Sequence, residues 1–399
     1  MVNIETFIYG EFFKHFMTTQ KEIIILGDVE MGGGTLTDDF ISDKALSELI
    51  SEISKKSHPV DLVFNGDTFD FLKCPSIIAG KKSFPRHVTE EISLNKLGLI
   101  YQAHQQVFIT LQKFLQKKEN NVYFVLGNHD HDLVYKSVQI EIKRLLQSQK
   151  QVHFPGFNYQ YSRVYVEHGH QYDFLNKVNP KHSFLNYKGE RILNIPWVSF
   201  SLISRFMEMK ETHPFMERIF PRPTLFAHHK NLFKKITHWT VEYMVKSIVY
   251  YPFRYHYDPT YTYPKEILRE FYRRYKDVHW DVDKIVDKFK RKKKRTFNKH
   301  QIHVLGHVHD KYLEENMGKV LIHPGSWRDE YELDVKTKKL TPKTKGYVTI
   351  LVSEDGSLDW KIINHPMTRS SLHLDDVMKD EKKYIHFAAK EENFKFKIF

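Results

Sequence analysis

Cysteine is nearly absent from this sequence. Cys74 is the only one, so no disulfide bond can form within the chain. Proteins that carry unpaired cysteine and no disulfide framework are typical of reducing compartments. The sequence therefore argues against a disulfide-stabilised secreted protein and predicts a cytoplasmic location.

Long apolar segments are missing as well. The opening residues, MVNIETFIYGEFFKHF, contain neither the early basic cluster nor the unbroken apolar region of a signal peptide. The longest uncharged apolar stretch, Ile192 to Ser204, has 13 residues, whereas a helix that spans a bilayer needs about 20. We therefore expect no membrane-spanning helix, and we expect this stretch to form a core or interfacial helix.

Negative charge is scarce in one part of the chain. The whole sequence has a formal charge of +12, and residues 175–300 contain 27 Lys and Arg against 12 Asp and Glu. The same stretch holds 24 of the 57 aromatic residues and ends in the basic run KRKKKR, Lys290 to Arg295. We interpret residues 175–300 as a mostly helical insert or cap. Concentrated positive charge favours an anionic partner such as nucleic acid, lipid headgroups or a phosphorylated metabolite, although a solvated basic face is the alternative.

The pattern of apolar residues predicts an α/β protein. Apolar runs typical of strands alternate with helical periodicity in the first 170 residues, and strand-like runs dominate after residue 300. We expect strands at Lys21–Val29, Val60–Phe64, Asn121–Leu126, Tyr161–Val166, Ile302–Leu305, Val320–His323, Tyr347–Val352 and Leu358–Ile363, and helices at Asp39–Lys55, Ser93–Gln116 and Val134–Gln147. The expected division is a first core half (1–174), the insert (175–300), a second core half (301–365) and a C-terminal tail (366–399).

Acidic residues follow the first expected strand. LGDVEMGGG places Asp28 and Glu30 two residues apart, so an extended backbone would point both side chains the same way. Two neighbouring carboxylates repel each other unless a cation or a proton lies between them. A solvated turn is the alternative interpretation of this stretch taken alone.

Four later stretches repeat this arrangement. Each places polar side chains just after an apolar strand, and a glycine beside most of them allows a sharp turn. They are FNGDTFD with Asp67 and Asp70, VLGNHD with Asn128, His129 and Asp130, VEHGHQYD with His168, His170 and Asp173, and VLGHVHD with His307 and His309. Carboxylate, amide and imidazole donors without thiolate suit Mn²⁺, Fe²⁺ or Zn²⁺. Two such ions about 3.5–4 Å apart can clamp a phosphoryl group for in-line attack.

The order of these motifs resembles the calcineurin-like metallophosphoesterase superfamily, over residues 21–175 and 300–365. The resemblance implies a four-layer β-sandwich flanked by helices, with two divalent ions, Mn²⁺ first and Fe²⁺ or Zn²⁺ as alternatives. Carried over by position, Asp28, Asp67 and His309 would hold one ion. Asp67, Asn128, His168 and His307 would hold the other, with Asp67 bridging. His129 would act on the phosphoryl group or the leaving group, and Asp130 would orient His129.

Glu30 departs from the family pattern, which usually has histidine at this position. A carboxylate can ligate a hard cation, so we include Glu30 among the candidate ligands. The alternatives are a residue that supports the ligands from outside, or a weakened first site.

The substrate is the least determined part of the prediction. The motif GDTFDF and the position of the insert look most like the UDP-2,3-diacylglucosamine pyrophosphatase branch. Leu193, Trp197, Phe200, Ile203 and Met207 would form one helical stripe, which suits an anionic membrane at the inner face or, alternatively, the protein core. We expect a phosphate ester or pyrophosphate hydrolase acting on a phosphorylated small molecule or a lipid-linked, amphipathic substrate. The alternatives are a nuclease-type phosphodiesterase that binds nucleic acid through the insert, and a non-catalytic protein with a decayed site.

Overall fold

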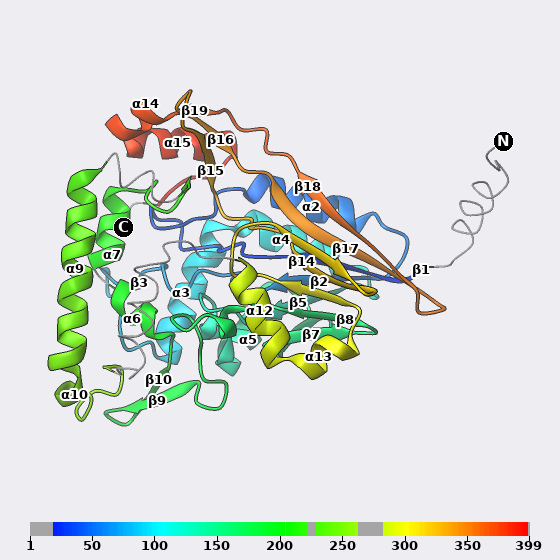
Figure 1. Ribbon diagram of the computed structural model, residues 1–399, viewed down its shortest axis with the longest axis horizontal. Helices are drawn as coiled ribbons and strands as arrows, with labels where there is room; N and C mark the ends of the chain where they lie inside the picture. Colours follow the sequence, from blue (N-terminus) through cyan, green and yellow to red (C-terminus); the bar gives the residue numbers. More distant parts are fainter. Residues whose placement is uncertain (1–18, 204, 222–228, 262–281, 398–399) are drawn as a thin grey trace.

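Two β-sheets stacked face to face form the centre of the molecule (Figure 1). The computed structural model describes residues 19–203, 205–221, 229–261 and 282–397. The larger sheet has six strands in the order β18-β17-β1-β2-β5-β6. They span Thr19–Leu26 (β1), Val60–Asn65 (β2), Asn121–Val125 (β5), Val152–Gly156 (β6), Lys345–Ser353 (β17) and Leu358–His365 (β18).

The second sheet has five strands in the order β13-β14-β12-β8-β7. They span Asn158–Tyr161 (β7), Val164–Glu167 (β8), Ile302–Leu305 (β12), Tyr312–Asn316 (β13) and Lys319–His323 (β14). β12 runs parallel to both β8 and β14, and β1, β2, β5 and β6 run parallel in the larger sheet. Strands that run in the same direction end at the same edge of the sheet. The motif residues come directly after these strand ends.

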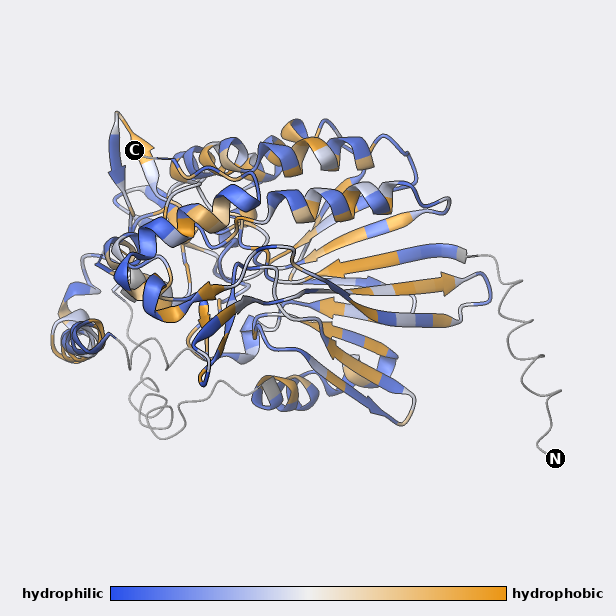
Figure 2. Ribbon diagram, turned by 90° about the horizontal axis from the view of Figure 1, so that it is seen from above, coloured by the Kyte–Doolittle hydropathy of each residue, from blue (hydrophilic) through white to orange (hydrophobic). Residues whose placement is uncertain are grey.

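Side chains at alternating positions of the strands point to opposite faces of the sheet and form two separate apolar cores. In β1, Ile23 and Ile25 face the second sheet, while Ile24 and Leu26 face the helices on the outer side. The outer helices are α2 (Asp43–Ser54), α3 (Glu90–Ala103), α4 (Gln105–Phe114) and α5 (Lys136–Leu145). Burial on both faces requires strands that are apolar at successive positions, and Figure 2 shows apolar residues concentrated along these strands.

The outer face of the five-stranded sheet is covered by α12 (Val282–Lys292) and α13 (Lys294–Lys299). Phe289 of α12 packs with Tyr165 and Leu321, which point away from the other sheet. The order of layers is thus helices, sheet, sheet, helices, and the predicted four-layer α/β architecture is confirmed. The basic run Lys290 to Arg295 lies on this outermost layer.

Several expected elements differ in detail. The strand expected at Lys21–Val29 ends at Leu26, so Asp28 and Glu30 follow it with positive φ and not as an extended strand, and the helix expected at Asp39–Lys55 begins at Asp43. The helix expected at Ser93–Gln116 is interrupted at His104, whose backbone is not helical and whose ring nitrogens lie 2.7 Å from Asp43 and 3.0 Å from Asp38. The strand expected at Tyr161–Val166 is a hairpin of β7 and β8. The helix expected at Val134–Gln147 begins as a 3₁₀ turn, His131–Val134 (η1), before α5. Periodicity does not reveal such breaks, because the buried face continues through them.

A further apolar cluster joins the insert to the end of the chain. It surrounds a four-stranded sheet in the order β11-β15-β16-β19, formed by Ile219–Phe220 (β11), Tyr331–Asp334 (β15), Lys339–Pro342 (β16) and Leu372–His373 (β19). Helices α7 (Arg205–Thr212), α9 (Lys230–Val249), α14 (Leu374–Lys379) and α15 (Glu381–Glu391) contribute side chains. Residues 366–397, expected as a tail, therefore pack against the folded body.

The predicted stripe of the insert is not a lipid-facing helix. Leu193 ends strand β10 (Glu190–Leu193), which pairs with β9 (Phe184–Tyr187), and the chain continues as the short helix α6 (Trp197–Leu202) before α7. Phe200 and Met207 are buried, so the alternative, packing within the protein, is correct. The remaining elements are the hairpin of Ser76–Ile78 (β3) and Lys81–Ser83 (β4), the 3₁₀ turn His170–Tyr172 (η2), and Tyr251–Arg254 (α10). In the described part of the chain, no helix combines the length and apolarity needed to cross a bilayer.

Candidate metal centre

The motif residues meet where the strands of both sheets end. The side-chain amide of Asn65, at the end of β2, donates to the carbonyl of Glu167 at the end of β8 (3.1 Å). The backbone N–H of His307, after β12, donates to both carboxylate oxygens of Asp28, after β1 (3.1 and 3.2 Å). These contacts hold the two sheet ends together, so five loops distant in sequence share one edge.

Asp67 lies at the centre of this edge. Its Oδ2 is 3.0 Å from Nε2 of His168, and its Oδ1 accepts the backbone N–H of His129 at 2.8 Å. Donor atoms of Asp67, His168 and His307 all lie within 4.8 Å of one another. Burial would raise the pKa of Asp67, but the neighbouring His168 and His129 hold it well below its usual range. The side chain is therefore a carboxylate able to bind cations on either side.

The orientation of His168 is fixed from outside the cluster. Its Nδ1 lies 2.9 Å from the carbonyl oxygen of Asn65 and donates to it, which directs Nε2 toward Asp67. The amide oxygen of Asn128 lies 3.2 Å from that same Nε2. A histidine held by a backbone carbonyl in this way is typical of metal ligands.

Two glycines make this approach sterically possible. A Cβ on Gly66 would lie 2.5 Å from the ring of His168, and a Cβ on Gly127 would lie 2.0 Å from Oδ1 of Asp67. Gly66 also has a positive φ of 77°. Contact distance thus requires both glycines, and the backbone conformation is a second requirement at Gly66.

A second group of donors gathers beside Asp28. His309 directs Nε2 toward Asp28 Oδ1 and Glu30 Oε1, each at 3.7 Å, while its Nδ1 lies 2.7 Å from Oε1 of Glu330. Burial, reinforced by the negative charges of Asp67 and Glu30, raises the pKa of Asp28 to about 8. A divalent cation beside these carboxylates would reverse that shift, because it stabilises the ionised form. The sequence analysis did not identify Glu330, which lies outside the motifs.

Glu30 faces two environments. Its Oε1 is directed at His309, whereas its Oε2 lies 2.9 Å from Nζ of Lys73 and 3.4 Å from Nε of Arg328. One oxygen is thus available to a cation near Asp28, and the other is neutralised by buried cationic side chains. Both alternatives for Glu30, ligand and supporting residue, have a structural basis.

His129 has a different orienting partner from the one expected. Its Nδ1 lies 2.9 Å from Oδ1 of Asp70. Asp130 instead accepts the backbone N–H groups of Gly127 (2.6 Å) and Thr68 (2.9 Å). The expectation that Asp130 orients His129 is therefore wrong. Asp130 joins the loops after β2 and β5, and the motif GDTFD supplies the orienting carboxylate through its second aspartate.

The remaining histidines divide into two kinds. His307 places Nε2 3.1 Å from Asp173, and one of its ring nitrogens belongs to the cluster with Asp67 and His168. His170 is buried beside the rings of His168 and His307. His303, on β12, packs against Phe289 and Phe297, in agreement with a packing role.

Four candidate ligands have a left-handed backbone conformation. Asp28, Glu30, Asp67 and His307 have positive φ values of 45°, 56°, 48° and 79°. Such conformations cost of order 1–3 kcal/mol each and persist where the surrounding structure enforces them, often at functional sites. Here they turn side chains from separate loops toward one another.

A buried ionic network adjoins the candidate centre. The carboxylate of Asp39, fully buried, lies 2.6 Å from Lys73, 2.8 Å from Lys210 and 2.8 Å from Arg328. Glu217 of the insert lies 2.6 Å from Lys210. Burial would raise the pKa of Asp39, but these cations hold it well below its usual range. Sequence analysis missed this network, because its members are scattered from residue 30 to residue 328.

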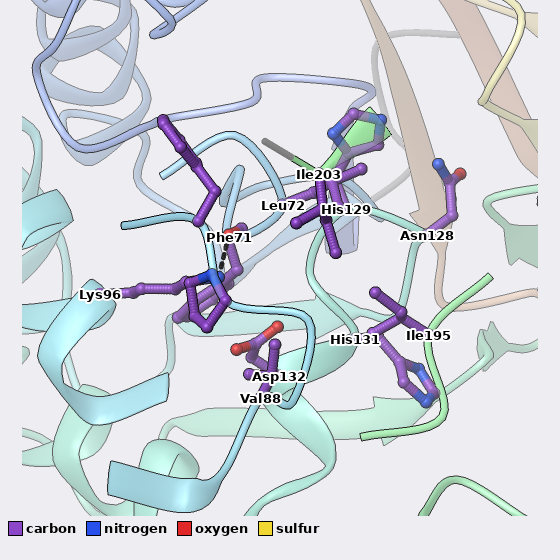
Figure 3. A pocket seen from close by; sticks show the side chains of 12 residues that line it. Phe71, Leu72, Val88, Lys96, Asn128, His129, His131, Asp132, Ile195 and Ile203 are labelled. Carbon is purple, nitrogen blue, oxygen red and sulfur yellow. Dashed lines mark hydrogen bonds between the residues drawn. The ribbon is translucent and has the colours of Figure 1, made fainter. Parts of the chain in front are cut away.

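A small cavity opens beside the candidate catalytic residues. Figure 3 shows Asn128 and His129 bordering it together with Leu72 and Ile203, and the dashed line marks the bond from Lys96 to the carbonyl of Phe71. Ile203 also lines a second cavity of about 340 Å³ between α6, α7 and α9, where Trp197, Phe206 and Trp239 supply apolar walls. The small cavity beside His129 is lined mostly by residues of the core, the larger one mostly by residues of the insert, and Ile203 borders both.

Comparison with solved structures gives only distant similarities. A Vps29 single mutant from Entamoeba histolytica aligns over 86% of this chain and 99% of its own, with 8% identity and a TM-score of 0.26. A protein described as a 5'-nucleotidase from Staphylococcus aureus, in complex with alpha-ketoglutarate, aligns over 93% of this chain and 58% of its own, with 12% identity and a TM-score of 0.32. Both TM-scores are low, so neither similarity carries weight here. No curated protein matches the sequence.

The family comparison is more informative. The family described as calcineurin-like phosphoesterase matches residues 22–311, which is well over half of the chain. The matched segment begins in β1, ends just after His309, and includes every candidate ligand from Asp28 to His309. By sequence and by the arrangement of its strand-end residues, this chain belongs to the calcineurin-like phosphoesterase family.

Proposed function

We propose that this chain is a two-metal hydrolase of phosphate ester or pyrophosphate bonds and that its substrate carries an apolar group. The main support for this proposal is that Asp67, His168 and His307 converge at the common edge of the two sheets. The donor set fits divalent ions, since it combines carboxylates with imidazoles held by hydrogen bonds and contains no thiolate. We propose Mn²⁺ as the preferred ion, with Fe²⁺ or Zn²⁺ as alternatives.

The proposed ligands form two overlapping groups. Asp28, Glu30, Asp67 and His309 would hold one ion, and Asp67, Asn128, His168 and His307 the other. When bound, such a pair supplies an acidified water and neutralises charge on the phosphoryl oxygens. Within these groups, the protein supplies orientation through Asn65, Glu330 and Asp173.

His129 is the proposed proton donor. Burial would lower its pKa, but Glu30, Asp70 and Asp67 raise it to about 9. Asp70, which is not among the proposed ligands, favours the protonated ring, and a protonated ring can stabilise charge on a phosphoryl oxygen or donate a proton to the leaving group. Asp70 holds Nδ1, which leaves Nε2 as the atom that meets the substrate.

The apolar group of the substrate would lie in the insert. Ile203 lines both the small cavity beside His129 and the larger cavity lined by Trp197, Phe206 and Trp239. One substrate molecule could thus place its phosphate at the metal centre and its apolar group near Ile203. This arrangement supports a lipid-linked or otherwise amphipathic substrate.

The test is hydrolysis of a substrate panel by the full chain with added Mn²⁺, Fe²⁺ or Zn²⁺. The panel contains phosphomonoesters, oligonucleotides and other phosphodiesters, and nucleoside diphospho-lipids, and we expect the highest kcat/KM for lipid-bearing members. Asp67→Ala should abolish metal binding and activity, whereas Asp61→Asn, an equally buried carboxylate on β2 that pairs with Lys21, should retain both. Two bound metal ions in Asp67→Ala, or a preference for oligonucleotides, would contradict the proposal.

A further inference from the structure

A second group of metal-type donors lies outside the motif loops. His213 follows α7, His229 directly precedes α9, and Glu381 is the first residue of α15. Figure 1 shows α7 and the start of α9 close to α15. Three elements that are distant in sequence therefore bring two imidazoles and one carboxylate to a single point, and none of the three residues belongs to a phosphoesterase motif.

The distances suit a shared ion. Oε1 of Glu381 lies 2.8 Å from Nδ1 of His213 and 3.3 Å from Nε2 of His229. One donor atom from each residue lies within 4.8 Å of both others. Ligands placed tetrahedrally at about 2.0–2.2 Å from Zn²⁺ are separated from one another by similar distances.

The hydrogen bond between His213 and Glu381 does not explain why His229 is placed beside them. Its Nε2 is buried and has no hydrogen-bond partner among the described residues, although it faces Glu381. Glu381 is already engaged by His213 through Oε1 and by the backbone N–H of Phe215 through Oε2 (3.0 Å). Burying an imidazole nitrogen without a partner is unfavourable, and a metal ion would satisfy it.

The surroundings can hold such a site rigidly. Met209, Phe215 and Leu232 are buried near the three donors and belong to one apolar cluster with residues of α15. The side chains of His213 and His229 remain 28% and 23% exposed, so water can complete the coordination.

We propose that His213, His229 and Glu381 bind one transition-metal ion, best represented by Zn²⁺, which fastens α15 to α7 and α9. Two nitrogen donors and one oxygen donor with an open position match zinc coordination. Because the ion would bind the folded state, it would stabilise the attachment of the C-terminal helix to the insert. The site requires no catalytic activity and does not depend on the proposed function.

The decisive variant is His229→Gln, because toward the described residues its ring makes no hydrogen bond and only the 3.3 Å contact with Glu381. In a chelator, the full chain and His229→Gln should have equal melting temperatures. With added Zn²⁺, the wild-type chain should melt several degrees higher than the variant and bind one more zinc per chain by titration. Zinc bound at the motif loops would raise the melting temperature and the zinc count of both proteins equally, so it does not affect the difference between them.

The matched control is His238→Gln, an exposed histidine on α9 that should behave as wild type in both measurements. Glu381→Gln should also lose one zinc, which provides a second readout if His229→Gln were to fold poorly. Equal zinc stoichiometry in wild type and His229→Gln, with equal increases in melting temperature, would overturn the proposal and leave a hydrogen-bonded pair of His213 and Glu381.

Discussion

Nδ1 of His129 lies 2.9 Å from Oδ1 of Asp70, and these residues come from loops that follow different strands. If His129 acts on the substrate, His129→Ala should retain its metal ions and lose about 10²–10⁴-fold in kcat. Asp70→Asn should lose about 10–100-fold, as is usual for a residue that orients another. Metal analysis together with steady-state kinetics checks both variants. Loss of metal from His129→Ala would instead make His129 a ligand.

Glu30→Gln should show whether Glu30 binds a metal ion, stabilises the buried cations Lys73 and Arg328, or does both. The variant leaves Lys73 and Arg328 with one anion fewer in a buried site, so we expect the free energy of unfolding to fall by about 3 kcal/mol. If Oε1 is a ligand, the variant should also bind one metal ion more weakly. Urea unfolding and metal titration measure the two effects independently.

Two variants make the Glu30 comparison sharper. Lys73→Met should destabilise the protein while keeping its metal content, since Lys73 is no ligand. Glu48→Gln, exposed on α2, serves as the surface control. Unchanged metal affinity in Glu30→Gln would place this glutamate among the supporting residues, and its departure from the family pattern would then concern stability alone.

Trp239→Ala enlarges the cavity between α6, α7 and α9 and removes an apolar wall. For lipid-bearing substrates we expect KM to rise about tenfold, which corresponds to roughly 55 Å² of lost apolar contact. A small water-soluble phosphodiester should be hydrolysed at the wild-type rate. Val245→Ala, an exposed position on the same helix, is the control. Equal losses on both substrates would mean that Trp239 supports the fold.

Peripheral contact with anionic membranes remains a proposal, and the structure offers two surfaces to test. Phe253 and Tyr257 are 71% and 77% exposed near basic Lys246 and Arg254. We expect Phe253→Ser with Tyr257→Ser to reduce cosedimentation with vesicles that contain phosphatidylserine. Replacing the exposed Lys292, Lys293 and Lys294 by alanine should weaken binding by about 1 kcal/mol per charge at low salt. Unchanged sedimentation of both variants would exclude these surfaces.

His104 predicts a pH-dependent contribution to stability. Burial would lower its pKa, but Asp43 and Asp38 raise it to about 10, above the value of about 6.5 expected in the unfolded chain. The folded state therefore holds the proton more tightly, so the stabilisation is complete below about pH 6.5 and is lost as pH rises toward 10. The difference in melting temperature between wild type and His104→Gln should shrink from pH 6 to pH 10. A constant difference would contradict this assignment.

Sequence analysis located the strand-end residues because each motif combines an apolar run, a glycine and metal-type side chains within a few positions. Asp28, Asp67, His168 and His307 are local signals of this kind, and the parallel strands bring them together. The residues that orient them are different. Glu330 contacts His309 across 21 positions, and Asn65 holds His168 across 103. Such partners carry no local pattern, so only the fold reveals them.

The insert was the hardest part to predict. Its composition identified it as distinct, but a helical stripe cannot distinguish a lipid-facing surface from an interior one. The stripe is interior because Phe200 packs into the apolar core beside the larger sheet, while the neighbouring Met209 of α7 packs with residues 366–397, which carry no motif. The break at His104 was missed for a similar reason, since Asp38 and Asp43 lie far from it in sequence.

The network around Asp39 has a consequence for protein engineering. Lys210 and Glu217 belong to the insert, Lys73 and Arg328 to the core, and all of them meet at one buried carboxylate or its neighbours. A chimera in which this insert were deleted or exchanged for another enzyme's cap would leave Asp39 short of a counter-ion beside the candidate metal centre. Cap and catalytic body are thus not interchangeable parts, and any transplant would have to carry both halves of the ionic network.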